Sequence, residues 1–185
     1  MKVKPIKDRQ KIEDIKKLLS SEPRNYCLFV CGINNGLRAG DLLSLKVGQV
    51  KNKKIGDYVE IKEQKTGKIN YFYINKTIKK SIDNLIKTYN LSDNDYLFPS
   101  RKGKEKMTTY TVNRLVKNWC KSVGLTGNYG SHSLRKTWGY QQRANFGVSW
   151  ELISKRYNHS NPAETRVYLG ISDTEITNIC LNNEI

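Results

Sequence analysis

Apolar residues recur every three or four positions over most of the chain, which is the period of an amphipathic helix. This spacing predicts helices at Ile12–Leu19, Leu37–Leu45, Ile78–Tyr89 and Val112–Trp119, and a continuous apolar segment, Tyr26–Ile33, follows Pro23. Two shorter segments, Tyr58–Lys62 and Ile69–Ile74, alternate apolar and polar residues instead, and the turn between them contains Gly67. Alternation on both sides of a glycine-containing turn predicts a β-hairpin.

The last third of the chain continues the helical pattern, with breaks at Gly130, Gly147 and Asn158. Asn161 followed by Pro162 is typical of a helix start, with the asparagine as N-cap and the proline at the first helical position. No repeat, low-complexity tract or linker separates one part of the chain from another. The pattern predicts an α+β fold that is mostly α-helical, with one small antiparallel sheet.

Charge narrows the class of partner. The chain carries 33 Lys and Arg residues against 17 Asp and Glu, a formal net charge of +16. Such an excess repels itself in the compact state, so a polyanionic partner is its natural explanation, with nucleic acid first and an anionic membrane surface second. No apolar run approaches the ~20 residues needed to cross a bilayer, and no apolar stretch of signal-peptide length follows Met1. We therefore expect a cytoplasmic protein.

Two interpretations fit the cysteines, which are Cys27, Cys31, Cys120 and Cys180. Cys27 and Cys31 are four residues apart in an apolar segment, so a helix would place them on one face. A zinc site is the weaker interpretation, because the chain has only two histidines, both distant in sequence, and no CxxC pair. We expect buried free thiols in a reducing compartment, and no metal or other cofactor.

Two arginine-containing motifs fall at predicted helix starts. Arg38, in Gly36-Leu37-Arg38-Ala39-Gly40-Asp41, precedes an apolar helix, and Asp41 is placed either to cap that helix or to brace the arginine. In His132-Ser133-Leu134-Arg135 the histidine and the arginine are three apart and share a helix face. Gly130-Ser131 would put both at a helix N-terminus, which favours an anion. Taken singly, each motif is more typical of an ordinary role, a solvated arginine in both and a capping histidine in the second.

Other candidate residues lie in the hairpin turn and in the last third. Lys65 and Lys68 both belong to the predicted turn, where a lysine can reach outward as a mobile cation or proton donor. His159 precedes the helix that begins at Pro162, and Tyr168 lies about two turns inside that helix. In a lysine-rich chain with 11 tyrosines, a solvated turn lysine and a packing tyrosine are the ordinary interpretations of each residue alone.

The order of these residues, taken together, is specific. An arginine, a lysine on a β-hairpin, a His-x-x-Arg motif, a histidine and a tyrosine nine residues later form the signature of the tyrosine recombinases of the phage integrase family. The chain resembles the catalytic domain of that family from about Ile12 to Ile171, nearly its whole length. The residues that match the family's catalytic positions are Arg38, Lys65, His132, Arg135, His159 and Tyr168.

This resemblance implies site-specific cleavage and rejoining of DNA, as in integration, excision or inversion, through a 3′-phosphotyrosyl intermediate. Tyr168 would attack phosphorus, and the ester would conserve the bond energy, so that a DNA hydroxyl can reverse the step without ATP or a metal. Arg38 and Arg135 would clamp the non-bridging phosphate oxygens with charged, bidentate forks.

The resemblance also implies how protons move. Lys65 would protonate the leaving 5′-oxygen, with Lys68 as its rival in the same turn. His132 would accept the proton of the tyrosine or orient the phosphate, and His159 would donate a hydrogen bond to a non-bridging oxygen. Because a free tyrosine has a pKa of about 10, activation by the two arginines and a base is necessary.

Partner and assembly follow from the same resemblance: double-stranded DNA, bound by a homotetramer because recombination joins two duplexes, with a monomer in solution. Full-length members usually carry an N-terminal DNA-clamping domain of about a hundred residues. We expect residues 1–185 to form a single catalytic domain without that clamp, either an excised domain or a short member resembling the fimbrial-switch invertases. The segment from Ser172, with Ile176 and Ile179, would dock on a neighbouring subunit or pack on its own core.

Two other functions share parts of this residue set. A type IB topoisomerase relaxes supercoils as a monomer, but the spacing of the motifs and the small size of the chain favour a recombinase. A non-catalytic DNA-binding relative would have lost catalytic residues, and here all six positions hold the family's residue types.

Overall fold

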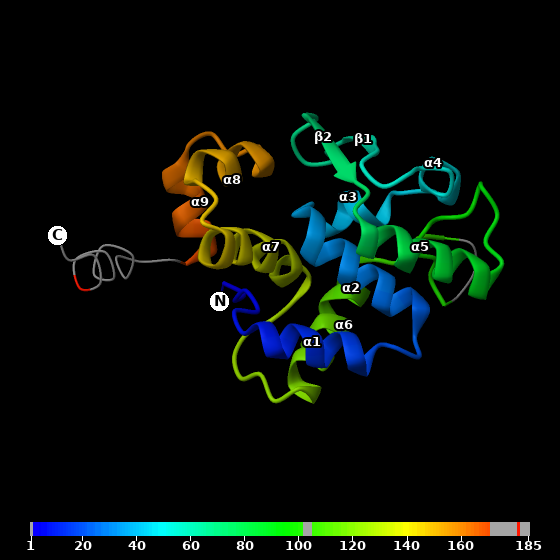
Figure 1. Cartoon of the computed structure of the whole chain (residues 1–185), viewed down its shortest axis with the longest axis horizontal. Coiled ribbons are helices and arrows are strands. Elements are labelled where there is room, and N and C mark those ends of the chain that lie inside the picture. Colours follow the sequence, from blue (N-terminus) through cyan, green and yellow to red (C-terminus); the bar gives the residue numbers. More distant parts are fainter. Residues whose placement is uncertain (1, 102–104, 171–180, 182–185) are drawn as a thin grey trace.

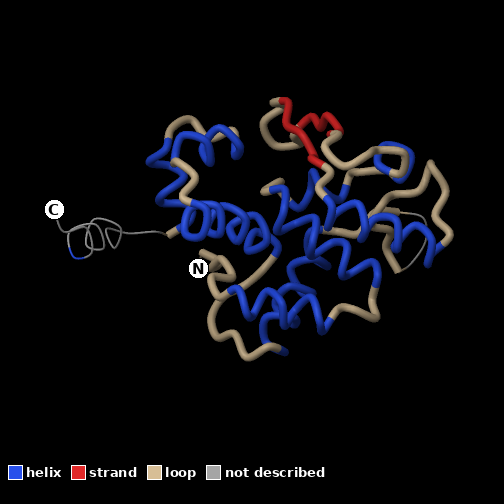
Figure 2. The backbone as a smooth tube through the Cα atoms, viewed as in Figure 1, coloured by secondary structure: helices blue, strands red, loops and turns tan. Residues whose placement is uncertain are grey.

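The computed structural model describes residues 2–101, 105–170 and 181, and within them the chain consists of helices and one β-hairpin (Figure 1) (Figure 2). The helices are α1 (Arg9–Leu18), α2 (Pro23–Asn35), α3 (Ala39–Leu43), α4 (Val47–Val50), α5 (Lys76–Tyr89), α6 (Thr109–Ser122), α7 (Ser131–Phe146), α8 (Trp150–Tyr157) and α9 (Pro162–Leu169). The strands are β1 (Tyr58–Lys62) and β2 (Ile69–Tyr73). The expected α+β class, mostly helical with a small antiparallel sheet, is confirmed. None of the helices in this part of the chain is long and apolar enough to cross a membrane.

The hairpin forms where the alternation predicted it, with β1 as expected and β2 one residue shorter. The strands pair antiparallel, with Tyr58 opposite Tyr73. Side chains alternate between the two faces of a strand, so every second residue points into the protein. The buried residues of this inner face are Val59, Ile61, Asn70 and Phe72. Gly67 has φ +68° in the turn, a left-handed conformation that favours glycine.

The main core surrounds α2, which packs against both α5 and α7 and is buried on most sides. A smaller core lies between α7, α8 and α9 and is formed by Trp150, Ile153, Tyr157 and Leu169. Figure 1 shows α7 between the α8–α9 pair and the body built from α1 to α6. Helix α7 therefore contributes to both packing layers, and residues of its first turns can reach both.

The predicted helix Leu37–Leu45 is shorter than the apolar pattern suggested. Only α3 is helical, and Arg38 is its N-cap in an extended conformation. The helix ends at Ser44 because the following residues pair with a distant segment: Leu97 N–H donates to the Leu45 carbonyl at 2.8 Å, and Lys46 forms a β-bridge with Tyr96. The short helix α4 after this bridge was not predicted, because four residues carry too little periodicity to be recognised.

The cysteines within the described ranges are buried free thiols, as expected. The Sγ atoms of Cys27 and Cys31 lie 3.8 Å apart, and the Ser81 hydroxyl donates to Cys27 Sγ at 3.4 Å. Burial raises the pKa of the Cys31 thiol, and it raises the pKa of the Cys120 thiol to about 12. The thiols of Cys31 and Cys120 are therefore protonated packing groups. Cys180 and the apolar stripe of Ile176 and Ile179 lie outside the described residues.

Candidate active site

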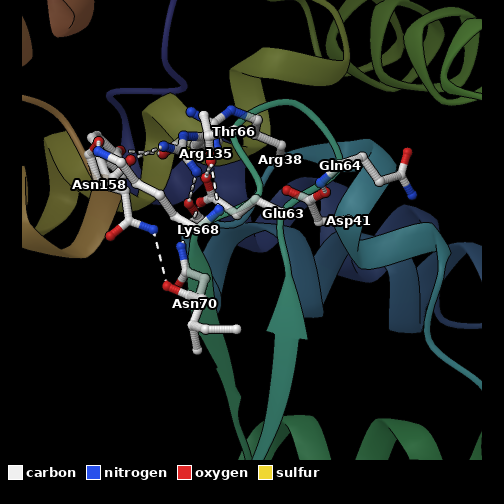
Figure 3. A network of polar contacts seen from close by, with 12 residues as sticks. Arg38, Asp41, Glu63, Gln64, Thr66, Lys68, Asn70, Arg135 and Asn158 are labelled. Atoms are coloured by element: carbon white, nitrogen blue, oxygen red, sulfur yellow. Dashed lines mark hydrogen bonds and ion pairs between the residues drawn. The ribbon is translucent and has the colours of Figure 1, made fainter.

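Arg38 stands at the junction of α2 and α3. Gly36 ends α2 with φ +63°, and a Cβ on this glycine would lie 2.7 Å from the Trp138 ring. The chain can therefore turn tightly against α7 and present the next residues at the start of α3. The guanidinium of Arg38 meets the Glu63 carboxylate, with Nη1 and Oε2 2.5 Å apart. Figure 3 shows Arg38 approaching this carboxylate at the end of β1.

Glu63 is the buried anion of the site and was not singled out from the sequence. Its side chain is fully buried and accepts hydrogen bonds from Thr66 Oγ1 at 2.5 Å and Asn70 Nδ2 at 2.7 Å. The sequence did contain a signal for Glu63, because this residue continues the alternation of β1 that places Val59 and Ile61 on the buried face. An acid in an inward position needs polar partners. Here those partners come from the hairpin itself and from Arg38.

We expect Glu63→Gln to reduce the loss of stability on acidification. Burial raises the pKa of Glu63, but the hydrogen bonds from Thr66 and Asn70 and the charge of Arg38 outweigh burial and hold this pKa below its ordinary value of 4.5. The resulting stability is complete above the unfolded-state pKa and is lost as the pH falls through the lower folded-state pKa. Urea unfolding between about pH 5 and about pH 2 should therefore show a steeper decline for the wild type.

Glu60→Gln is the matched control, because Glu60 lies exposed on the same strand. It should decline as the wild type does. If Glu63→Gln declined equally steeply, protonation of Glu63 would not be the source of the acid sensitivity.

Asp41 neither caps α3 nor pairs with Arg38, the two roles left open by the sequence. Its Oδ1 accepts the Gln64 backbone N–H at 2.9 Å, and Gln64 Nε2 donates to the Gly40 carbonyl at 3.2 Å. Burial raises the pKa of Asp41, while the hydrogen bond from Gln64 opposes that effect. The first turn of α3 thereby holds the residue that precedes Lys65, and the hairpin turn lies against the start of α3.

The two hairpin lysines point to different places. Lys65 lines a cleft of about 480 Å³, together with Arg38 and His132, whereas Lys68 does not line it. Lys68 Nζ instead lies 3.5 Å from the carbonyl of Asn158, at the end of α8. Figure 3 shows Lys68 on the side of the hairpin that faces Asn158. Lys65 is therefore the hairpin lysine that faces the cleft.

His132 lies in the first turn of α7 and lines the same cleft as the hairpin residues Gln64 and Lys65. The start of α7 is held by α6, because Asn113 Oδ1 accepts the Ser131 N–H at 3.2 Å. Partial burial lowers the pKa of His132, and the charges of Arg135 and Arg38 lower it further. A histidine with a lowered pKa is neutral at neutral pH and can accept a proton or a hydrogen bond.

Arg135 is almost completely buried, 2% exposed, one turn further along α7. Its Nη1 donates to the Gly36 carbonyl and its Nη2 to the Tyr157 carbonyl, both at 2.8 Å, and its guanidinium lies 4.3 Å from the centroid of the Tyr157 ring. An arginine has five N–H donors in a fixed fork, so two carbonyls leave three donors for a ligand. The motif taken alone was also compatible with a solvated arginine, and the burial of Arg135 shows that this alternative is wrong.

Tyr168 lies on α9 with its hydroxyl buried and without a hydrogen-bond partner among the described residues. Burial raises the pKa of Tyr168, and the charges of Arg135 and Arg38 oppose that effect, as does the approach of the Arg135 side chain to the hydroxyl, which falls short of a full hydrogen bond. The His159 ring contacts the Tyr168 ring edge to face, with centroids 5.4 Å apart, and His159 Nδ1 lies 2.8 Å from Thr165 Oγ1. Burial also lowers the pKa of His159, which favours the neutral ring.

The six predicted residues thus form two adjoining groups. Arg38, Lys65 and His132 share the cleft, while Arg135, His159 and Tyr168 gather around the ring of Tyr157. The two groups act on each other electrostatically, because the charges of Arg38 and Arg135 influence the pKa of His132, of His159 and of Tyr168. Among the described residues, no three His, Cys, Asp or Glu side chains come together to hold a metal ion.

Two supporting residues were not recognised from the sequence. The fully buried Tyr157 hydroxyl donates to the Arg135 carbonyl at 2.6 Å and accepts the Gly139 N–H at 3.1 Å. Arg156 joins α8 to the hairpin through Asn70 and the Tyr71 carbonyl and to the end of α2 through the Asn35 carbonyl, and burial lowers its pKa to about 10. Their neighbours are distant in sequence, so no local pattern could identify them.

Comparison with known proteins gives the family of the chain. A model of the phage integrase family matches residues 7–175. The chain belongs to the phage integrase family. It is 34% identical over 174 residues to the probable integrase/recombinase YoeC of Bacillus subtilis, covering 92% of this chain and 91% of YoeC. The predicted membership of the tyrosine recombinases, as a catalytic domain, is confirmed.

Other phage integrase family members are longer than this chain. It is 28% identical over 174 residues to the tyrosine recombinase XerC of Caldanaerobacter subterraneus, covering 89% of this chain but 48% of XerC. The crystal structure of XerA recombinase has the same fold, with a TM-score of 0.79 and 20% identity over 98% of this chain and 66% of that chain. The chain therefore spans nearly all of one relative and about half of another.

Proposed function

We propose that this chain cuts and rejoins double-stranded DNA at specific sites, with Tyr168 as the nucleophile. The observation that carries the proposal is the state of the Tyr168 hydroxyl, which is buried, makes no full hydrogen bond within the described residues and is approached by the charged Arg135 side chain, next to a cleft that contains two more cations and a histidine. A buried hydroxyl without a partner is costly and needs an explanation. Attack on a phosphate placed between Arg38 and Arg135 explains it.

The proposed step conserves the phosphodiester bond energy. Tyr168 Oη attacks phosphorus, the bond between phosphorus and the 5′-oxygen breaks, and a 3′-phosphotyrosyl ester remains on the DNA. His132 accepts the tyrosine proton and Lys65 donates a proton to the leaving 5′-oxygen. Attack by a 5′-hydroxyl of another strand reverses the sequence, and every proton returns by the same groups.

The two arginines supply the charge that the transition state requires. Arg135 is fixed by two carbonyls and a ring, and Arg38 is held by Glu63, so neither must reorganise as negative charge develops on the phosphate. Preorganised donors of this kind contribute about 3–4 kcal/mol each when compared with oxyanion-hole deletions. His159, fixed by Thr165, is placed to donate a further hydrogen bond to a non-bridging oxygen.

DNA binding itself is supported by the formal charge of +16 over 185 residues. Because recombination joins two duplexes, we propose a homotetramer on DNA and a monomer in solution, with residues 1–185 as one catalytic domain acting on DNA in the cytoplasm. Relatives that nearly match this chain in length and relatives twice as long both exist. Binding by the catalytic domain alone is therefore part of the proposal.

A nicked suicide duplex tests the proposed function directly. Its short 5′ fragment diffuses away after cleavage, so rejoining is blocked and the phosphotyrosyl ester accumulates. Denaturing gel electrophoresis should show a covalent protein–DNA species, and mass spectrometry should locate the adduct on the peptide that contains Tyr168. An adduct on another tyrosine, or cleaved DNA without any adduct, would contradict the assignment.

A thiol leaving group should identify the general acid. A 5′-bridging phosphorothiolate needs no proton to leave, so it should restore cleavage to Lys65→Ala, which we expect to be about a hundredfold slower on ordinary DNA. Lys68→Ala, which removes the lysine beside Asn158, should cleave both substrates normally. The measurement is the single-turnover cleavage rate on both substrates, and rescue of Lys68→Ala instead would make Lys68 the acid.

A further inference from the structure

Lys136 is a buried lysine that the proposed mechanism does not use. It follows the His132-x-x-Arg135 motif directly and is 5% exposed. Its Nζ lies 4.7 Å from the centroid of the Tyr168 ring. Within the residues that the structure describes, no carboxylate forms an ion pair with it. An ammonium kept from water without an anion destabilises a fold. Its retention beside the proposed nucleophile therefore calls for a role.

Four side chains surround Tyr168: a tyrosine, a histidine, an arginine and a lysine. Tyr157 and His159 contact it edge to face, with centroids 5.6 Å and 5.4 Å away. The Arg135 charge acts on its hydroxyl, and the Lys136 ammonium lies over its face. The aromatic contacts limit the tilt of the Tyr168 ring. Of these four groups, only Lys136 makes a cation–π contact with the ring.

We propose that Lys136 is a positioning residue for the nucleophile, which holds the Tyr168 ring through a cation–π contact and stabilises its phenolate form. The inference rests on the proposed role of Tyr168. A cation is attracted to the electron-rich face of an aromatic ring. Ionisation of the hydroxyl adds negative charge to the ring, so the attraction is stronger for the phenolate than for the phenol. An interaction that strengthens as the nucleophile forms accelerates the step. Lys136 itself forms no bond and transfers no proton.

Other titratable groups surround both Lys136 and Tyr168. The wall around Lys136 also carries Lys2, Lys4, Lys7 and Asp8, in a cavity of about 470 Å³ beside α9. Burial lowers the pKa of Lys136, and the charge of Lys2 lowers it further. Tyr168 is approached by Arg135 of α7, by Arg38 at the N-cap of α3, by Tyr157 at the end of α8 and by His159 in the loop between α8 and α9. Replacing Lys136 removes one of three positive charges near Tyr168, so the phenol should become harder to ionise.

Titration of a labelled residue 168 measures this effect without requiring activity. We would replace Tyr168 by 3-fluorotyrosine and follow its ¹⁹F resonance with pH in the otherwise unchanged chain, in Lys136→Met and in Lys136→Arg. Lys136→Met should raise the ionisation midpoint by about one pH unit, and Lys136→Arg should stay near the starting value. Lys46→Met is the matched control, because Lys46 is an exposed lysine 5.5 Å from the ring of Tyr96, outside the site.

The cleavage reaction supplies a second readout. With a suicide duplex, Lys136→Met should be slower by about tenfold near neutral pH, and the deficit should narrow as the pH rises. The dissociation constant for DNA should change by less than about threefold, since one charge among many is removed. If Lys136→Met fails to fold, Lys136→Gln takes its place, because it keeps a polar end while removing the charge.

The outcomes separate the two ideas. An unchanged ¹⁹F midpoint in a folded Lys136→Met or Lys136→Gln protein would overturn the role of Lys136, whatever the activity. A rate deficit that is the same at every pH would show ordinary structural damage and would also overturn it. If the unaltered protein formed no adduct at Tyr168, the proposed function would fail, while the titration would still measure the effect of Lys136 on the ring.

Discussion

Tyr168→Phe should abolish the covalent DNA adduct completely while leaving the fold and DNA binding intact. The change removes only the hydroxyl, which is the proposed attacking atom. Because this buried hydroxyl has no hydrogen-bond partner among the described residues, its loss leaves no other group unsatisfied, and the free energy of unfolding should stay the same or rise slightly. Urea unfolding, DNA binding and the suicide-duplex assay together test the prediction.

Tyr157→Phe provides the matched control, since it removes a neighbouring buried hydroxyl that does have partners. The Tyr157 hydroxyl donates to the Arg135 carbonyl and accepts the Gly139 N–H. Its loss should lower the free energy of unfolding by about 1–3 kcal/mol, because both backbone groups lose a buried partner. The adduct should still form at temperatures where this variant is folded. A Tyr168→Phe protein that still trapped DNA would rule out Tyr168 as the nucleophile.

Arg38→Ala should slow cleavage of bound DNA by about a hundredfold or more, as expected for removal of a preorganised cation from the transition state. It should also lower the free energy of unfolding by about 1–3 kcal/mol, because the Glu63 carboxylate stays buried with fewer partners. Affinity for DNA should fall only slightly, because many other cations remain. Single-turnover rates at saturating protein separate the effect on chemistry from the effect on binding.

The double variant Arg38→Ala with Glu63→Gln separates stability from catalysis. Neutralising Glu63 removes the unpaired buried charge. The double variant should therefore lose about 0.5–3 kcal/mol less free energy of unfolding than the sum of the two single losses, which is the usual coupling between residues in contact. Cleavage should not recover, because the cation is still missing. Recovery of cleavage together with stability would mean that Arg38 acts only by holding the hairpin. Arg9→Ala, an exposed arginine on α1, controls for the loss of one positive charge.

Much of the fold was accessible from the sequence because its signals are local. The hairpin was predicted within one residue, since alternation and a glycine turn depend on neighbours along the chain. The N-cap at Asn161 and the breaks at Gly130, Gly147 and Asn158 were also correct, because they depend on local residue type: Gly130 is the extended N-cap of α7, and Gly147 and Asn158 have left-handed φ values. The end of the predicted helix at Leu45 was wrong, because the next residue, Lys46, forms a bridge with the distant Tyr96.

The sequence by itself determined the family and the set of six candidate residues, because their types and order are properties of the chain. Only the tertiary structure decided how these residues are held. Arg38 pairs with Glu63 and not with Asp41, which is nearer in sequence. Arg135 donates to a carbonyl 99 residues away. Lys65 faces the cleft, while Lys68 faces the end of α8. A local period states which face of a helix or strand is buried. It contains no information on which distant group a buried polar atom meets, and that choice is made when the elements pack.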